Sequence, residues 1–172
     1  MPAMRGSVRH KSIALPPIDI DPDLACIAPR VQKGLAYWRD KAAGRAMPLR
    51  SDIKPEEIAS LLPSICLFEL RRSSGGFEMF PRLAGSRFEE VFGPIHNKPL
   101  ATMLAPEIVE RWLGAARAVV EVRAPLRLTG KVLHDDKTYI RFELVLAPLS
   151  TEGEEIDMLY LVSHFETALP QA

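Results

Sequence analysis

The chain has 172 residues, of which 47% are hydrophobic and 26% charged, so it is long enough to fold around one core of ordinary size. Its 22 Lys and Arg residues balance 22 Asp and Glu residues, and this zero net charge argues against general nucleic-acid binding, which depends on neutralising phosphates. No window approaches the roughly 18 apolar residues of a membrane span, and no signal-peptide core follows the N-terminus, which predicts a cytoplasmic protein.

We expect one folded domain between two tails. Prolines interrupt residues 1–22, which show no apolar period and are predicted to form a flexible N-terminal tail. Residues 23–63 form a predicted helical segment, residues 64–166 form the main domain, and residues 167–172 form a short C-terminal tail.

An amphipathic helix dominates the helical segment. Val31, Leu35 and Trp38 follow one another at spacings of four and three, so they share one apolar face, and Leu24 continues the same register. Gly44 is well placed to end this helix. An apolar face of this kind needs a partner, which is either the sheet of its own domain or the matching helix of another subunit.

The rest of the chain alternates between strand and helix patterns. Apolar runs and period-two alternation predict five strands, and apolar residues at helical spacing predict further helices. The predicted strands cover residues 65–70, 77–83, 124–133, 138–148 and 155–165, and the predicted helices cover residues 55–62, 86–92 and 107–122. The order is therefore two helices, two strands, further helices and three strands.

Two blocks, residues 37–63 and residues 82–100, resemble a known family in the order and separation of their residues. The matching residues are Tyr37, Trp38, Arg45, Pro48, Arg50, Asp52, Ile53, Pro55, Ile58, Leu61, Leu62, Pro63, Arg82, Leu83, Ala84, Gly85, Phe92, Gly93, Pro99 and Leu100. On these residues the chain resembles the stand-alone PAS-like domains best known from alphaproteobacteria. The resemblance implies an α+β fold, with helices on one face of a five-stranded antiparallel sheet, and a sensory or regulatory role in which separate signalling proteins receive the signal.

The same resemblance indicates where a small apolar ligand would lie, if the space is not simply a packed core. The residues expected on the inner face of the sheet are Phe88, Phe92, Trp112, Leu126, Leu128 and Phe142. His96, in the adjoining loop, is included among the residues that border this candidate cavity, although we interpret it as an exposed residue in preference to a haem ligand. Residues 86–93 contain no cysteine, so the cysteine-based flavin chemistry of photosensory PAS proteins is excluded, and the sequence names no cofactor.

No catalytic or metal-binding set emerges from the sequence. The two cysteines are forty positions apart, a spacing that fits no metal site. Paired carboxylates lie in predicted turns or on helix surfaces, so we find no acid-base pair in a cleft. The alternative to a regulatory module is a small-molecule-binding or enzymatic domain. In that case Arg39, Arg45 and Arg50 would bind an anion, or His96 would hold a haem-type group.

The last strand leaves an apolar surface that needs a cover. Both of its alternating sets are apolar, and an antiparallel sheet with an apolar outer face is covered by its own chain or by a partner. The predicted interface residues are Val31, Leu35, Trp38, Leu159, Leu161 and Phe165. We therefore expect either a homodimer through the N-terminal helix or a cover supplied by that helix within the chain.

Overall fold

The computed structural model describes residues 18–134, 137 and 140–167 of the chain. Its centre is a six-stranded antiparallel sheet with the strand order β1-β4-β5-β6-β2-β3. The strands are β1 (Asp19–Asp21), β2 (Ile65–Ser73), β3 (Gly76–Ala84), β4 (Leu126–Lys131), β5 (Ile140–Leu149) and β6 (Met158–Thr167). The helices are α1 (Pro29–Ala42), α2 (Ser86–Phe92), α3 (Leu100–Met103) and α4 (Pro106–Val122), with the short 3-10 helices η1 (Arg50–Asp52), η2 (Pro55–Ile58) and η3 (Leu62–Ser64) between α1 and β2.

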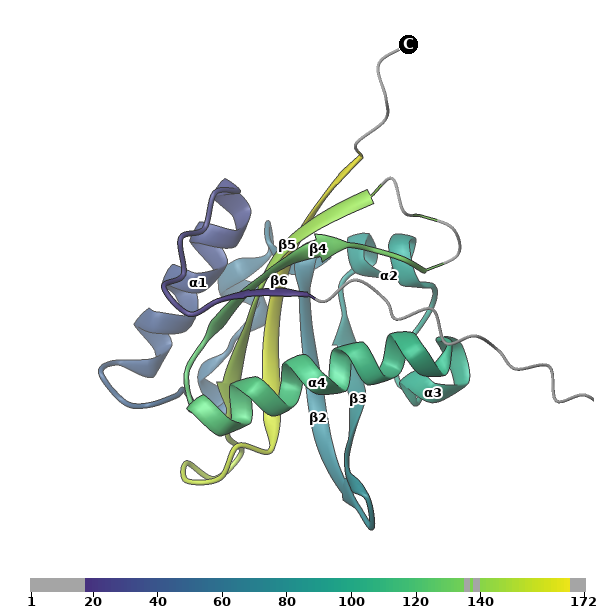
Figure 1. Cartoon of the computed structure of the whole chain (residues 1–172). Helices are drawn as coiled ribbons and strands as arrows, with labels where there is room; N and C mark the ends of the chain where they lie inside the picture. Colours follow the sequence, from purple (N-terminus) through teal and green to yellow (C-terminus); the bar gives the residue numbers. More distant parts are fainter. Residues whose placement is uncertain (1–17, 135–136, 138–139, 168–172) are drawn as a thin grey trace, which may run out of the picture.

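Helices lie on both faces of this sheet (Figure 1). The face that carries α2 and α4 is called the inner face, and the face that carries α1 is called the outer face. On the inner face, Ile108, Trp112 and Val119 of α4 are buried at helical spacing, which confirms the predicted helix over 107–122. No helix in the described part of the chain is long and apolar enough to cross a membrane.

Helix α1 covers β5 and β6 with the apolar stripe that the sequence predicts. Pro29 occupies its first turn, where the missing N–H removes no intrahelical hydrogen bond. Val31, Leu35 and Trp38 are at most 5% exposed. The indole Nε1 of Trp38 donates a hydrogen bond of 3.0 Å to the carbonyl oxygen of Pro148 on β5, so the buried polar atom of this ring has a partner.

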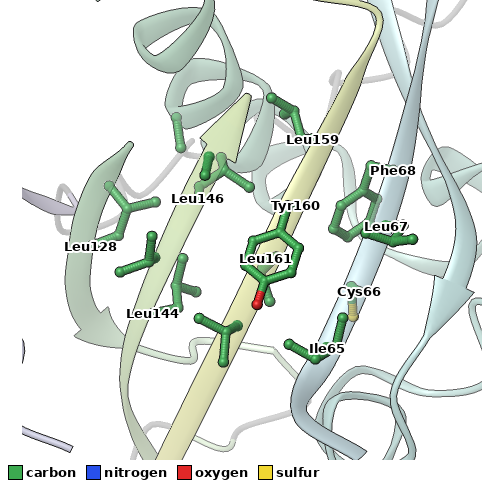
Figure 2. Close-up of a cluster of buried hydrophobic side chains, with 14 of the residues drawn as sticks. Ile65, Cys66, Leu67, Phe68, Leu128, Leu144, Leu146, Leu159, Tyr160 and Leu161 are labelled. Carbon is green, nitrogen blue, oxygen red and sulfur yellow. The ribbon is translucent and has the colours of Figure 1, made fainter. Parts of the chain in front are cut away.

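The closest approach between α1 and the sheet occurs at Gly34. A Cβ atom at this position would lie 2.5 Å from Cγ2 of Val162 on β6, so only a residue without a side chain fits. Beside this contact, the buried hydroxyl of Tyr160 donates a hydrogen bond of 2.9 Å to the carbonyl oxygen of Gly34. Figure 2 shows Tyr160 on β6, between β5 with Leu144 and Leu146 and β2 with Leu67 and Phe68, all of them buried residues.

Two expectations about the N-terminal part are wrong. Residues 1–22 were expected to be a tail, but Asp19–Asp21 form β1, which pairs with β4 and gives the sheet six strands where five were predicted. A three-residue edge strand carries too little pattern to be recognised from sequence. Leu24 has a φ of 57° in the connection between β1 and α1, so it lies outside the helix whose register it seemed to continue. Residues 1–17 and 168–172 lie outside the described residues.

Candidate functional site

The residues predicted to surround a ligand lie together on the inner face, where they contact one another. The ring centroids of Phe88 and Phe92 are 4.7 Å apart, and those of Phe92 and Trp112 are 5.6 Å apart. Trp112 in turn lies 5.9 Å from Phe142 of β5. All members of the predicted set except His96 are buried: Phe88, Phe92, Trp112, Leu126, Leu128 and Phe142. These side chains fill the space between the sheet and the helices with their own contacts, as in a packed core.

His96 does not join this aromatic cluster. It is exposed in the loop after α2, and its Nε2 lies 3.0 Å from the carbonyl oxygen of Arg82 on β3. Its backbone N–H donates a hydrogen bond of 3.2 Å to Oε2 of Glu89, so the residue anchors the loop beside the edge strand. A different histidine reaches the cluster: the ring of His134 stacks on Phe92 with 5.8 Å between centroids. The geometry therefore gives no support to a haem-type site at His96.

Two of the three arginines proposed as an anion site bind groups of their own chain. Arg45 donates from Nη2 to Oδ2 of Asp52 over 2.7 Å and also binds two carbonyl oxygens at the end of α1. The Arg45 guanidinium, helped by a backbone N–H, holds the pKa of Asp52 below its usual value. Arg50 donates to the carbonyl oxygen of Ile53, and Arg39 is exposed on α1. Arg45 and Arg50 thus stabilise the connection that follows α1, Arg45 through three hydrogen bonds and Arg50 through one.

The helical half of the predicted interface packs against its own sheet. Val31, Leu35 and Trp38 are buried within the single chain. The sequence left open whether the outer face is covered by the same chain or by a second subunit, and α1 of the same chain covers it. A second subunit could reach these three side chains only if α1 left the sheet.

The strand half of the predicted interface lies on the opposite face, which corrects the expected orientation of β6. The ring centroid of Phe165 lies 6.0 Å from that of Phe88, so Phe165 belongs to the inner face. Because side chains alternate along a strand, Leu159 and Leu161 share that face, while Tyr160 points to α1. The two alternating sets of side chains along β6 are both apolar because the strand is buried on both faces. Alternation in the sequence therefore could not assign either set to a face of the sheet.

The outer face carries a buried polar network at the start of α1. The Glu143 carboxylate on β5 accepts hydrogen bonds from the backbone N–H groups of Ile27 (3.0 Å) and Ala28 (2.8 Å), where a negative charge also suits the positive end of the helix dipole. Arg127 of β4 donates to the same carboxylate over 2.9 Å and contacts Asp21 of β1 over 3.3 Å. Backbone N–H groups, and then Arg127, hold the pKa of Asp21 below its usual value.

In front of this network the outer face is hollowed into a cavity of about 770 Å³, which we call the outer-face cavity. Side chains of β4, β5 and β6 form its floor, and the residues that lead into α1 form one wall. Its lining includes Lys131, Arg141 and the Arg127–Glu143 pair. Of the residues predicted to bind a ligand, Phe142 alone borders it within the described part of the chain. This site is not apparent from the sequence, because its charged residues resemble an ordinary solvent-facing set.

Comparison with protein-family models matches residues 28–162 to a model described as a PAS domain. This range runs from the residue before α1 into β6, so it includes the helix that covers the outer face. A comparison with curated proteins found no significant match. In the described residues, no three His, Cys, Asp or Glu side chains are grouped closely enough to hold a metal ion.

Proposed function

Because the chain belongs to the PAS domain family, we propose that it is a sensory or regulatory module of cytoplasmic signalling that acts through contacts with separate proteins. The observation that supports this proposal is the division of helix α1 into a buried side and a solvent side. Its apolar side is buried on the sheet, and its other side presents polar residues to solvent, including Gln32, Lys33, Arg39 and Asp40. This solvent side of α1 is the proposed contact surface.

The close packing of the inner face favours a module that acts through protein contacts over one that holds a ligand in its core. Phe88, Phe92 and Trp112 occupy the space between the sheet and α4 with ring contacts of their own. A ligand at that position would have to displace close-packed aromatic side chains, which costs the contacts that they now make.

The links between α1 and the sheet support a regulatory role for this helix. Glu143 binds the backbone at its start, Tyr160 binds the carbonyl oxygen of Gly34 near its middle, and Trp38 binds β5 further along. A shift of β5 or β6 would therefore move α1 as a unit, and the surface that a partner reads would move with it.

Charge reversal on the solvent side of α1 tests the proposal. The variant carries Lys33→Glu and Arg39→Glu, and its matched control carries Arg87→Glu and Lys98→Glu, which are also exposed and change the net charge equally. Proteins captured by the wild-type chain from its native cells would be identified, purified and titrated against all three forms. We expect the α1 variant to lose at least about tenfold in affinity while the control retains it.

Native mass spectrometry completes the test. Equal native and denatured masses are expected if the purified chain carries no ligand, and a mass lost on denaturation would show that a ligand is bound in addition to any protein contact. If the partner binds the α1 variant and the control with equal affinity, the contact surface is wrong. A dimer that persists in the α1 variant would show that self-association uses another surface.

A further inference from the structure

The strand register arranges the floor of the outer-face cavity into rows of charged residues. Lys131 of β4 pairs with Arg141 of β5, and Arg141 pairs with Glu166 of β6. In the next row, Glu143 of β5 pairs with Thr129 of β4 on one side and with His164 of β6 on the other. Because directly paired residues of antiparallel strands project to the same face, Lys131 and Arg141 stand side by side at the open end of the sheet.

This pairing of Lys131 with Arg141 brings two like charges together. Both side chains belong to exposed residues that line the cavity, and directly opposed like charges destabilise a strand pair. Within the described ranges, neither cation forms an ion pair with a carboxylate. The pair is therefore a site at which a bound anion would relieve repulsion and gain two charged contacts.

The nearby carboxylates have other partners. Glu143 binds Arg127 and the backbone at the start of α1, and Asp21 also contacts Arg127. Glu166 lies 3.0 Å from Nε2 of His164. Asp19 lines the cavity from β1, two strands away from Arg141. Among the described residues, the lining as a whole holds four cations (Arg111, Arg127, Lys131 and Arg141) and three carboxylates (Asp19, Glu143 and Glu166, the last paired with Arg141 in the register), so its balance is one positive charge.

A third cation adds to this charge from the inner side of β4. Arg111 of α4 donates from Nη1 to the carbonyl oxygen of Lys131 over 2.7 Å, and its guanidinium lies 5.7 Å from the centroid of the Phe142 ring. Its Nε and Nη2 atoms are buried without a hydrogen-bond partner in the described residues. The positive charge of Arg111 therefore acts on the same end of β4.

The wall of the outer-face cavity is apolar, in contrast to its floor. Ile27, Ala28 and Pro29 line it, and Ile27 is 76% exposed, so its side chain is accessible to a molecule in the cavity. A volume of about 770 Å³ lies within the range of small-molecule sites, roughly 300–1,000 Å³. The cavity thus combines a cationic floor with an apolar wall.

We propose that the outer-face cavity binds a small organic anion with an apolar body. Its carboxylate or phosphate group lies between Lys131 and Arg141, and its carbon skeleton lies against Ile27 and Pro29. This position is on the sheet face opposite the aromatic core, and it adjoins the residues where Glu143 holds the start of α1.

Anilinonaphthalene sulfonate is a suitable probe, since it joins an anionic group to an aromatic body and fluoresces when bound. We expect saturable binding to the wild-type chain, with displacement by octanoate if the site prefers a carboxylate or by phenyl phosphate if it prefers a phosphate. Octanol, which lacks the charge, should not displace the probe. Displacement by neither anion would overturn the proposal, and so would the absence of saturable binding.

The decisive variant is Lys131→Glu. It places a carboxylate directly opposite Arg141, so the strand pair gains an attractive contact and the midpoint of thermal unfolding should rise. The anion site is lost in the same step, and we expect the Kd of the probe to rise at least about tenfold. A midpoint at or above that of the wild type would show that weaker binding does not result from unfolding.

Lys98→Glu is the matched control, since it makes the same charge change at an exposed loop position. It should leave the Kd of the probe unchanged. Equal affinity of the wild type and Lys131→Glu for the probe would overturn the site. The result is separable from the protein-contact proposal, because the probe titration contains no partner and the variants in α1 leave the cavity floor intact.

Discussion

Gly34→Ala tests the contact that holds α1 on the sheet. The new Cβ would lie 2.5 Å from Cγ2 of Val162 and 2.7 Å from its Cβ, whereas an ordinary contact begins at 3.4 Å. Because the Cβ of Val162 is attached to the backbone of β6, rotation of the side chain cannot relieve the overlap. The helix must therefore move outward by about 1 Å, the difference between these distances, which weakens the hydrogen bond from Tyr160 to Gly34.

The expected loss of stability follows from three contributions. Overpacking costs about 1–3 kcal/mol. Loss of the Tyr160 hydrogen bond costs about 0.5–1.5 kcal/mol. Replacing glycine by alanine in a helix returns about 1 kcal/mol. The net effect is a destabilisation of about 2 kcal/mol, which lowers the midpoint of thermal unfolding by roughly 4–8 °C in a chain of this size.

Thermal and urea unfolding followed by circular dichroism would measure this loss. Gly114→Ala in α4 is the matched control, because a Cβ there meets nothing within 4 Å, and it should stabilise the protein by about 0.5–1 kcal/mol. Combining Gly34→Ala with Val162→Gly, which removes the Cβ of residue 162 together with both methyl groups, should recover at least about 1 kcal/mol relative to additivity. If Gly34→Ala stabilises the protein as Gly114→Ala does, α1 does not pack on β6 in this way.

Two further predictions concern the cysteines and acid stability. Burial raises the pKa of the Cys66 thiol to about 12 and also raises that of half-buried Cys26. At about pH 8 a thiol reagent should therefore label Cys26 slowly and Cys66 only after unfolding, and equal labelling rates in the folded protein would contradict this. Arg45 lowers the pKa of Asp52, so the stability that this pair contributes is complete above the ordinary Asp pKa of 3.8 and is lost as the pH falls through the folded value. Asp52→Asn should reduce the drop in unfolding midpoint between pH 7 and pH 3, and an unchanged drop would show that the pair does not contribute.

The sequence by itself determined the elements with a strong local pattern. Val31, Leu35 and Trp38 identified the buried stripe of α1, and the apolar spacing within 107–122 identified α4. These patterns are readable because each helix buries one side only, so apolar residues return with the helical period. The two blocks of matching residues also led to the PAS family, which the family comparison confirms.

The orientation of β6 required the tertiary structure. Leu159 and Leu161 face α4, and Tyr160 and Val162 face α1, yet all four residues are fully buried. Alternation reveals a face only when one side meets water, and β6 lies between two layers of helices. For the same reason, the residues predicted to form one dimer interface lie partly on the outer face of the sheet and partly on the inner face.

The outer-face cavity also depended on tertiary structure, because its charged residues come from separate strands. Along β4 alone, Lys131 reads as one more solvent-facing residue, and Arg141 reads in the same way along β5. Only the register of the β4–β5 pair places the two cations opposite each other, and only the position of α1 leaves that end of the sheet uncovered. Local sequence encodes periodicity and therefore burial, whereas the meeting of residues distant along the chain is determined by which strands pair and in which register.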